Sequence, residues 1–311
     1  MSDPRPVDLT SFSRDSRSEF LNIRGVRYHV RHWGEEGAPV LFMLHGWMDT
    51  SATFQFMVDA LQDEWHVIAP DWRGYGHTEF LLRPYWFPEY YADLEALLAH
   101  YSPEVPANLV GHSMGGAIAG IYASVRPHRV KSLAILDFLG LHSGQSAEAP
   151  DKIDQWLSEV SIPPSCHRVR PYRDIEALSR RLMSVNPRLS ESRAGYLALH
   201  TSRKTESGHV ELACDPWHKI PSPFPYHADD VMACWRKIVA PVLLLIAEEG
   251  FVQERFGSDQ PEMDRRLGCF FDLVTKNIAH AGHNLQHDQP EAVAAALEAF
   301  FNGSTRGGAK E

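Results

Sequence analysis

Residues 111–115 form a G-x-S-x-G pattern that directly follows a short apolar run, residues 107–110. A serine hydroxyl is a poor nucleophile, and such a pattern lifts the serine out of a tight turn between a strand and a helix, where glycines leave room for close packing. The next residues, 114–124, are rich in Ala, Ile and Gly, which favours a helix packed closely on a sheet. The spacing therefore predicts that Ser113 is the nucleophile of an acyl-transfer reaction.

A second group of residues suits the stabilisation of negative charge. His45, Gly46 and Trp47 follow a buried apolar run, residues 40–44, and form a loop after a predicted strand. An acyl-transfer enzyme directs two hydrogen-bond donors at the oxygen that becomes negative, one from just after the nucleophile and one from an earlier loop. The backbone N–H groups of Trp47 and Met114 are the candidates for these oxyanion donors.

A histidine suited to act as a general base occurs near the C-terminus. His283 lies in a loop after the last predicted strand and precedes an amphipathic helix, residues 291–301. In that loop it is placed to accept the proton of Ser113. His280 and His287 have spacings that a metal site uses, but no acidic group is placed to support such ligands, so we expect no metal.

The elements that must position these residues alternate between strands and helices. Residues 19–23 and 26–33 predict an antiparallel hairpin at a sheet edge, and the later strands are separated by helical stretches, which is typical of an α/β fold with a mostly parallel sheet. The later predicted strands are residues 40–44, 66–70, 107–110, 132–136, 242–246 and 270–275, and the helical stretches are residues 52–61, 90–100, 114–124, 231–238 and 291–301.

The pattern changes near Gly140, after the sixth predicted strand. Residues 144–150 are small, acidic and turn-forming, and residues 151–226 contain helical segments without a convincing strand. We interpret the region as a helical cap inserted into the α/β core. The predicted core consists of residues 19–140 and 227–303, and the predicted cap of residues 141–226.

Several of these motifs resemble the α/β-hydrolase superfamily, and the likeness extends almost from end to end. Residues 44–49 (LHGWMD), residues 111–116 (GHSMGG) and the cap stretch 181–190 are similar to the serine hydrolase-like family. The resemblance implies an α/β-hydrolase fold, a Ser-His-acid site and an inserted helical cap. Residues 71–76 also resemble haloalkane dehalogenases and epoxide hydrolases, but those families carry Asp where this chain has Ser113.

The acid that orients the histidine departs from the commonest superfamily pattern. Many of these hydrolases have G-x-x-D after the strand that is here residues 242–246, and the ungapped alignment puts Gly250 where the aspartate is expected. Glu248 and Glu249 lie on that loop, short of the expected position. Asp137 instead follows the sixth predicted strand, at the sheet edge where catalytic groups of open α/β folds converge. The serine hydrolase-like family is similar in having Asp there and glycine later, so we predict Asp137, with Glu248 and Glu249 as alternatives.

The composition limits the class of protein. The chain has 311 residues, 44% of them hydrophobic, and a net charge of -10, which disfavours nucleic acid and anionic membranes as partners. Residues 1–18 are polar and carry both charge signs, so we expect a disordered segment and no signal peptide. No apolar stretch approaches the roughly 20 residues of a membrane helix. The four cysteines lie far apart, which argues against disulfide, zinc and redox motifs. We expect a cytoplasmic protein without a cofactor.

The composition of the cap bears on the substrate. Its aromatic side chains suit either an apolar pocket or simply the core of the cap. Its basic side chains either steer an anionic substrate or form an ordinary solvated surface. The aromatic residues are Trp156, Tyr172, Tyr196, Trp217, Phe224 and Tyr226, and the basic ones are Arg168, Arg170, Arg173, Arg180, Arg181, Arg188, Arg193, Arg203 and Lys204.

Together these features favour a metal-free serine hydrolase that acts on a small or medium acyl compound, with carboxylic esters as the leading substrates. Two alternatives remain open. One is hydrolysis of a C–C bond in an activated dione, which uses the same kind of site. The other is a hydrophobic-ligand receptor on a hydrolase fold, with slow or absent turnover. The serine, the oxyanion loop and the histidine favour catalysis, because a receptor needs none of the three.

Overall fold

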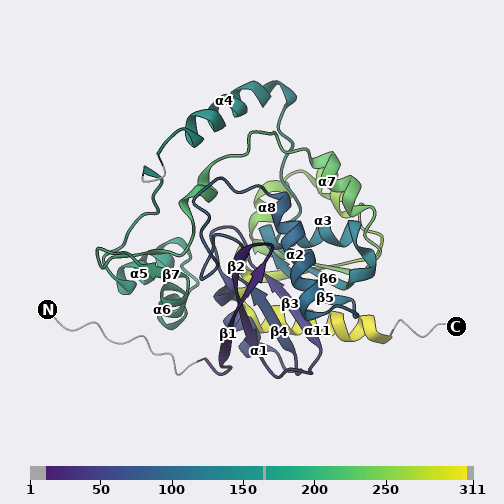
Figure 1. Ribbon diagram of the computed structural model, residues 1–311. Helices are drawn as coiled ribbons and strands as arrows, with labels where there is room; N and C mark the ends of the chain where they lie inside the picture. The colour runs from purple at the N-terminus through teal and green to yellow at the C-terminus, as the bar shows by residue number, and fades with distance from the viewer. Residues whose placement is uncertain (1–11, 164–165, 307–311) are drawn as a thin grey trace.

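The computed structural model describes residues 12–163 and 166–306. Its centre is an eight-stranded sheet with the strand order β1-β2-β4-β3-β5-β6-β9-β10 (Figure 1). β1 (Ser16–Ile23) and β2 (Val26–Trp33) form an antiparallel hairpin at one edge, and β2 is also antiparallel to β4 (His66–Pro70). All later pairs in the sheet are parallel. The predicted α/β fold with a mostly parallel sheet is confirmed.

The inner strands are short and buried on both faces, as their apolar runs predict. They are β3 (Val40–Leu44), β5 (Ala107–His112), β6 (Val130–Leu136) and β9 (Val242–Glu249). The edge strand β10 (Leu273–Gly282) differs from the prediction of residues 270–275, because it begins later and continues to Gly282. Six of its ten residues are exposed, and polar residues interrupt its apolar ones, so apolar periodicity could not mark its end.

Helices cover both faces of the sheet and create two separate apolar cores. On one face Leu97 of α2, Ile118 of α3 and Trp235 of α7 are buried, and on the other Met57 of α1 and Leu297 of α11 are buried. The bounds are α1 (Gln55–Ala60), α2 (Pro88–Tyr101), α3 (Met114–Val125), α7 (Ala228–Trp235), α8 (Phe251–Phe256), α9 (Gln260–Leu267), α10 (Leu285–Asp288) and α11 (Pro290–Arg306).

The inserted region contains α4 (Ala149–Val160), α5 (Ile175–Val185) and α6 (Glu191–His200), which lie outside the sheet and its covering helices (Figure 1). The expectation that residues 151–226 contain no strand is wrong. β7 (Ser202–Lys204) and β8 (Val210–Leu212) form an antiparallel pair after α6. Each has only three residues, which is too short to show the alternation by which strands are found.

The expected disordered segment, residues 1–18, is too long at its C-terminal end. Ser16 and Ser18 already belong to β1, where they pair with Trp33 and Arg31 of β2. Ser16 also accepts a hydrogen bond of 2.7 Å from the Arg31 guanidinium. Residues 1–11 lie outside the described part of the chain. Within the described ranges, no helix combines the length and the apolar character that a membrane span requires.

Candidate active site

Ser113 lies at the turn between β5 and α3, with φ 50° and ψ -114°. This left-handed backbone conformation is uncommon for a residue with a side chain. A Cβ on Gly115 would lie 2.0 Å from the carbonyl oxygen of Leu44, and a Cβ on Gly111 would lie 2.5 Å from the carbonyl carbon of Gly115. The glycines therefore allow α3 to approach β3 and β5 closely enough to form the turn.

A continuous line of hydrogen bonds joins Ser113, His283 and Asp137. His283 Nε2 lies 3.0 Å from Ser113 Oγ, and His283 Nδ1 lies 2.8 Å from Asp137 Oδ2. Because a carboxylate only accepts hydrogen bonds, Nδ1 carries the proton and Nε2 presents a lone pair to the serine hydroxyl. The histidine side chain is 35% exposed and that of Asp137 is fully buried. A molecule from solvent can thus reach the serine end, while the carboxylate is shielded from water.

Backbone groups near the end of β9 and at the start of α8 hold the Asp137 carboxylate. The N–H of Ala247 donates to Oδ1 at 3.1 Å and the N–H of Phe251 donates to Oδ2 at 2.6 Å. A Cβ on Gly250 would lie only 2.3 Å from Oδ2 of Asp137. The carboxylate from the end of β6 therefore fills the space that a side chain at position 250 would need.

The two alternative acids are engaged elsewhere. Glu248 accepts a hydrogen bond of 2.8 Å from the backbone N–H of His280, and Glu249 forms an ion pair with Arg188 of the cap. Both glutamates are exposed at the end of β9. Of the three predicted carboxylates, the structure brings Asp137 to His283.

His45 fixes the loop that carries the first candidate oxyanion donor. Its Nε2 accepts the N–H of Trp72 at 2.9 Å, and its Nδ1 donates to the carbonyl of Gly46 at 2.8 Å. Burial lowers the pKa of His45 to about 4, so the ring is neutral and this tautomer persists. In a trans peptide the N–H points opposite to the preceding carbonyl, so the bond to Gly46 also sets the direction of the Trp47 N–H. The loop touches the turn, since a Cβ on Gly46 would lie 3.3 Å from Ser113 Cβ.

The second candidate donor is the N–H of Met114, the first residue of α3. The first N–H groups of a helix have no partner within the helix, and the helix dipole places partial positive charge there. Trp47 and Met114 thus approach the neighbourhood of Ser113 from two different elements.

His112 links the turn to the loop that carries the histidine. Its Nε2 donates to the backbone carbonyl of His283 at 2.9 Å, and the two rings lie 4.8 Å apart. Burial holds the pKa of His112 well below its usual range, so its ring stays neutral. This bond anchors the backbone of His283 to the end of β5.

The other two histidines near the C-terminus occupy different surroundings. His287 is buried and its Nε2 lies 2.6 Å from Thr53 Oγ1, while His280 is exposed at the end of β10. Burial lowers the pKa of His287 to about 3. Among residues 12–163 and 166–306, no group of three or more His, Cys, Asp or Glu side chains is arranged to hold a metal ion.

Of the predicted cap aromatics, Tyr196 and Trp217 are buried, whereas Phe224 is 65% exposed.

Much of the predicted basic patch of the cap is paired with carboxylates. The ion pairs are Arg173 with Asp174, Arg180 with Glu176, Arg188 with Glu249, Arg193 with Glu291 and Arg203 with Glu211. These contacts reduce the positive charge that the sequence composition alone predicts for this surface.

One further Ser-His-Asp set was not found from the sequence. Ser18 Oγ lies 2.8 Å from His29 Nε2, and His29 Nδ1 lies 2.7 Å from Asp71 Oδ2. Ser18 lies within the edge strand β1, diagonally across from His29 on β2. Ser113 directly precedes α3, whereas Ser18 is followed by further residues of its strand, so no helix begins after it to supply donors for an oxyanion. The pairing of β1 with β2 brings Ser18 to His29, and the pairing of β2 with β4 brings Asp71 to it.

Comparison with known proteins identifies the family of this chain. The family model for the alpha/beta hydrolase fold matches residues 39–290. The chain belongs to the alpha/beta hydrolase fold family. A serine hydrolase-like protein of Danio rerio is 28% identical over 301 residues, covering 94% of this chain and 90% of that protein. Epoxide hydrolase 4 of Mus musculus is 30% identical over 294 residues, covering 91% of this chain and 78% of that protein. The predicted resemblance to serine hydrolase-like proteins is confirmed.

Solved structures of this alpha/beta hydrolase fold agree with the observed architecture. A thioesterase domain from the curacin biosynthetic pathway has a TM-score of 0.79 at 22% identity, covering 92% of this chain and 99% of that chain. E-2-(acetamidomethylene)succinate hydrolase has a TM-score of 0.72 at 21% identity, covering 93% of this chain and 100% of that chain. At these identities the likeness establishes the fold.

Proposed function

We propose that this protein is a serine hydrolase that cleaves a small or medium carboxylic ester through an acyl-enzyme on Ser113. The observation that carries the proposal is the hydrogen-bonded line from Asp137 through His283 to Ser113, with distances of 2.8 and 3.0 Å. A nucleophile, a base within hydrogen-bond reach and a third group that orients the base are the arrangement that nucleophilic catalysis requires.

The first half-reaction forms the acyl-enzyme. Ser113 Oγ attacks the carbonyl carbon of the ester while His283 Nε2 takes the hydroxyl proton, and Asp137 stabilises the resulting imidazolium. The carbonyl oxygen becomes an oxyanion that the N–H groups of Trp47 and Met114 stabilise. When the tetrahedral intermediate collapses, the C–O bond to the leaving alcohol breaks and His283 returns the proton to that oxygen.

The second half-reaction repeats the same chemistry with water. His283 Nε2 removes a proton from water, the hydroxide oxygen attacks the acyl carbon, and the Ser113 oxygen leaves and regains its proton from the histidine. The products are the free acid and the regenerated serine. Each step uses groups of this chain alone, so the proposal requires a small-molecule substrate and neither a metal nor a cofactor.

The likeness to epoxide hydrolases does not extend to their nucleophile. Those families use an aspartate, whose carboxylate forms an ester with the opened epoxide, and Ser113 stands at that place in this chain. A serine hydroxyl forms an ester only when the substrate supplies an acyl group, and an epoxide supplies none. The residue type therefore supports acyl transfer over epoxide opening.

A fluorophosphonate probe tests the nucleophile. We expect the wild-type protein to be labelled stoichiometrically on Ser113, and Ser113→Ala to lose both labelling and ester hydrolysis, the latter by about 10⁴- to 10⁶-fold. Ser18→Ala is the matched control, because Ser18 also lies in a Ser-His-Asp line. Mass spectrometry of the labelled peptide reports the site. Labelling of Ser113→Ala at Ser18 with unchanged hydrolysis would overturn the assignment.

A panel of esters with graded acyl length, together with an activated dione, tests the substrate class. We expect the highest kcat/KM for a small or medium ester. Preferential cleavage of the dione would instead support C–C bond hydrolysis by the same serine. Stoichiometric labelling without turnover of any compound would favour the ligand-receptor alternative.

A further inference from the structure

One short segment of the cap contacts the loop that carries His283. The side-chain amide of Asn186, at the end of α5, donates to Asp288 Oδ1 at 2.6 Å. The other oxygen of the same carboxylate, Oδ2, accepts the backbone N–H of Gly282 at 2.8 Å. Asp288 thus connects the cap with Gly282, the residue directly before His283.

Arg188, two residues further along the cap, contacts the same end of the loop. Its guanidinium forms an ion pair with Glu249 at the end of β9. The guanidinium also lies against the backbone of Gly282, because a Cβ on Gly282 would be 3.2 Å from Arg188 Nη1. A side chain at position 282 would therefore interfere with the cap contact.

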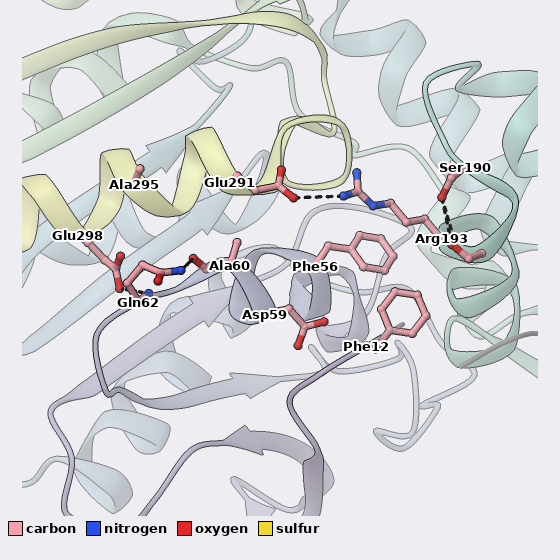
Figure 2. Close-up of a pocket in the computed structure, with 11 residues that line it drawn as sticks. Phe12, Phe56, Asp59, Ala60, Gln62, Ser190, Arg193, Glu291, Ala295 and Glu298 are labelled. Carbon is pink, nitrogen blue, oxygen red and sulfur yellow. Dashed lines mark hydrogen bonds and ion pairs between the residues drawn. The ribbon is translucent and has the colours of Figure 1, made fainter. Parts of the chain in front are cut away.

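Arg193 of α6 contacts the opposite end of the loop. Its Nη1 donates to the backbone carbonyl of His287 at 2.8 Å, and its Nη2 lies 3.6 Å from Glu291 at the start of α11. The guanidinium also lies 5.4 Å from the ring centre of Phe56 on α1. Figure 2 shows Arg193 extending from the cap towards Glu291. The two residues line a groove of about 770 Å³ together with Phe56 of α1. Residues 186–193 therefore contact both ends of the loop 282–288.

The loop itself has limited local structure. It contains α10, which has only four residues, and a helix this short has little stability of its own. The core supplies several anchors, which include the bonds of His283 to His112 and Asp137 and the bonds of Thr53 to Gln286 and His287. The position of the imidazole relative to Ser113 therefore also depends on the contacts that the cap supplies.

We propose that Asn186 and Asp288 are positioning residues that hold His283 within hydrogen-bond reach of Ser113 when the cap is docked, so that cap docking and the activity of the base are coupled. The proposal rests on the serine hydrolase function proposed above. An amide and a carboxylate are suited to this task, because the carboxylate accepts from the cap and from Gly282 at the same time. Displacement of residues 186–193 breaks the hydrogen bond from Asn186 to Asp288. The loop is then held only by its contacts with the core.

A reciprocal exchange of the two side chains tests the coupling. In Asp288→Asn the new amide offers one acceptor to two donors, so one hydrogen bond is lost, and in Asn186→Asp two carboxylates face each other. We expect each single variant to lower kcat by about 10- to 100-fold with KM changed by less than about threefold, because misplacing a catalytic group slows the chemical step. The double variant restores both hydrogen bonds, because the bond between positions 186 and 288 forms with donor and acceptor exchanged and the Gly282 N–H still donates to the amide oxygen at position 288. We expect its kcat to lie within about threefold of wild type.

Asp264→Asn is the matched control. Asp264 Oδ1 accepts from the amide of Gln260 at 2.6 Å on the exposed surface of α9, so the same chemical change is made away from the site. Its kcat is expected to stay within about twofold of wild type, as for most surface substitutions. Equal kcat in the wild-type, Asn186→Asp and Asp288→Asn proteins, or a double variant as slow as the single ones, would refute the positioning role.

Amide hydrogen exchange separates this inference from the proposed function, because it needs no substrate. We expect residues 282–289 to exchange about tenfold faster in Asn186→Ala than in wild type, the effect of losing one hydrogen bond, and unchanged in Asp264→Asn. If no ester is cleaved but the loop exchanges faster, the serine hydrolase proposal fails while the contact between cap and loop stands. Unchanged exchange in Asn186→Ala overturns the coupling whatever the activity.

Discussion

The Asp137 side chain and the glycine at position 250 are sterically linked. The Asp137 carboxylate lies where a side chain at position 250 would be, 2.3 Å from a Cβ built there. The N–H groups of Ala247 and Phe251 on either side of Gly250 donate to the same carboxylate. The end of β9 and the start of α8 thus hold the carboxylate beside His283, although this carboxylate comes from the end of β6.

Substitution of the three carboxylates distinguishes their roles. We expect Asp137→Asn to lower kcat by about 10³- to 10⁴-fold, because an amide can hold the wrong tautomer of His283 and cannot stabilise its imidazolium. Glu248→Gln and Glu249→Gln should retain kcat within about tenfold, since their carboxylates bond to the His280 backbone and to Arg188. Steady-state kinetics on proteins with matched circular dichroism spectra make the comparison. A larger loss in either glutamine variant than in Asp137→Asn would place the acid on the later loop.

The elements set the site through close approaches between backbones. α3 comes so near to β3 that a Cβ on Gly115 would lie 2.0 Å from the carbonyl oxygen of Leu44. The cap is attached by a second set of contacts besides residues 186–193. The N–H of Gly76 donates to the Ala213 carbonyl and the N–H of Asp215 donates to the Gly74 carbonyl, both at 2.7 Å. In contrast, none of the 12 residues of α4 is buried.

Two glycine-to-alanine changes test the approach of α3. Gly115→Ala should lower the free energy of unfolding by about 3 kcal/mol or more, because the methyl group meets a backbone oxygen that cannot move without displacing β3. Gly303→Ala in α11 is the control, since its Cβ meets nothing within 4 Å. Removing a helical glycine there should be neutral or stabilising by up to about 1 kcal/mol. Urea denaturation measures both changes, and a Gly115→Ala protein as stable as wild type would contradict the tight packing.

At the scale of the whole molecule, several histidines are buried in neutral form. Burial lowers the pKa of His45 to about 4 and that of His287 to about 3, from 6.5. Between these values and 6.5 the unfolded chain binds more protons than the folded protein, so stability decreases as the pH falls below about 6.5. Asp49 acts in the opposite direction, because burial raises its pKa to about 6 and its ionisation costs stability as the pH rises towards that value. The two histidines together outweigh the one carboxyl.

We therefore expect the urea midpoint to fall between pH 7 and pH 5. Each buried histidine contributes at most about 1.4 kcal/mol per pH unit in this window. His287→Gln should reduce the slope, because the amide can still bond to Thr53 and does not titrate. His128→Gln, at an exposed position, serves as the control and should leave the slope unchanged. A wild-type protein more stable at pH 5 than at pH 7 would contradict this balance.

Local sequence patterns predict those parts of the protein in which burial follows the order of residues along the chain. Apolar runs gave the bounds of β3 and β4 as observed, because a strand buried on both faces must be continuously apolar. The glycines around Ser113 predicted the turn between β5 and α3, since few other residues fit a backbone this close. The prediction of Asp137 as the partner of His283 rests on its position after the sixth predicted strand and on the resemblance to the serine hydrolase-like family.

Contacts between residues far apart in the sequence depend on how the strands pair and how the cap packs on the core. β6 and β9 are neighbours in the sheet, and their pairing brings Asp137 beside Gly250 and leaves Glu248 and Glu249 at the exposed strand end. Asn186 and Asp288 are 102 positions apart in sequence, and their hydrogen bond follows from the docking of the cap. Local periodicity reports which residues are buried, but strand order, register and docking fix the contacts across the chain.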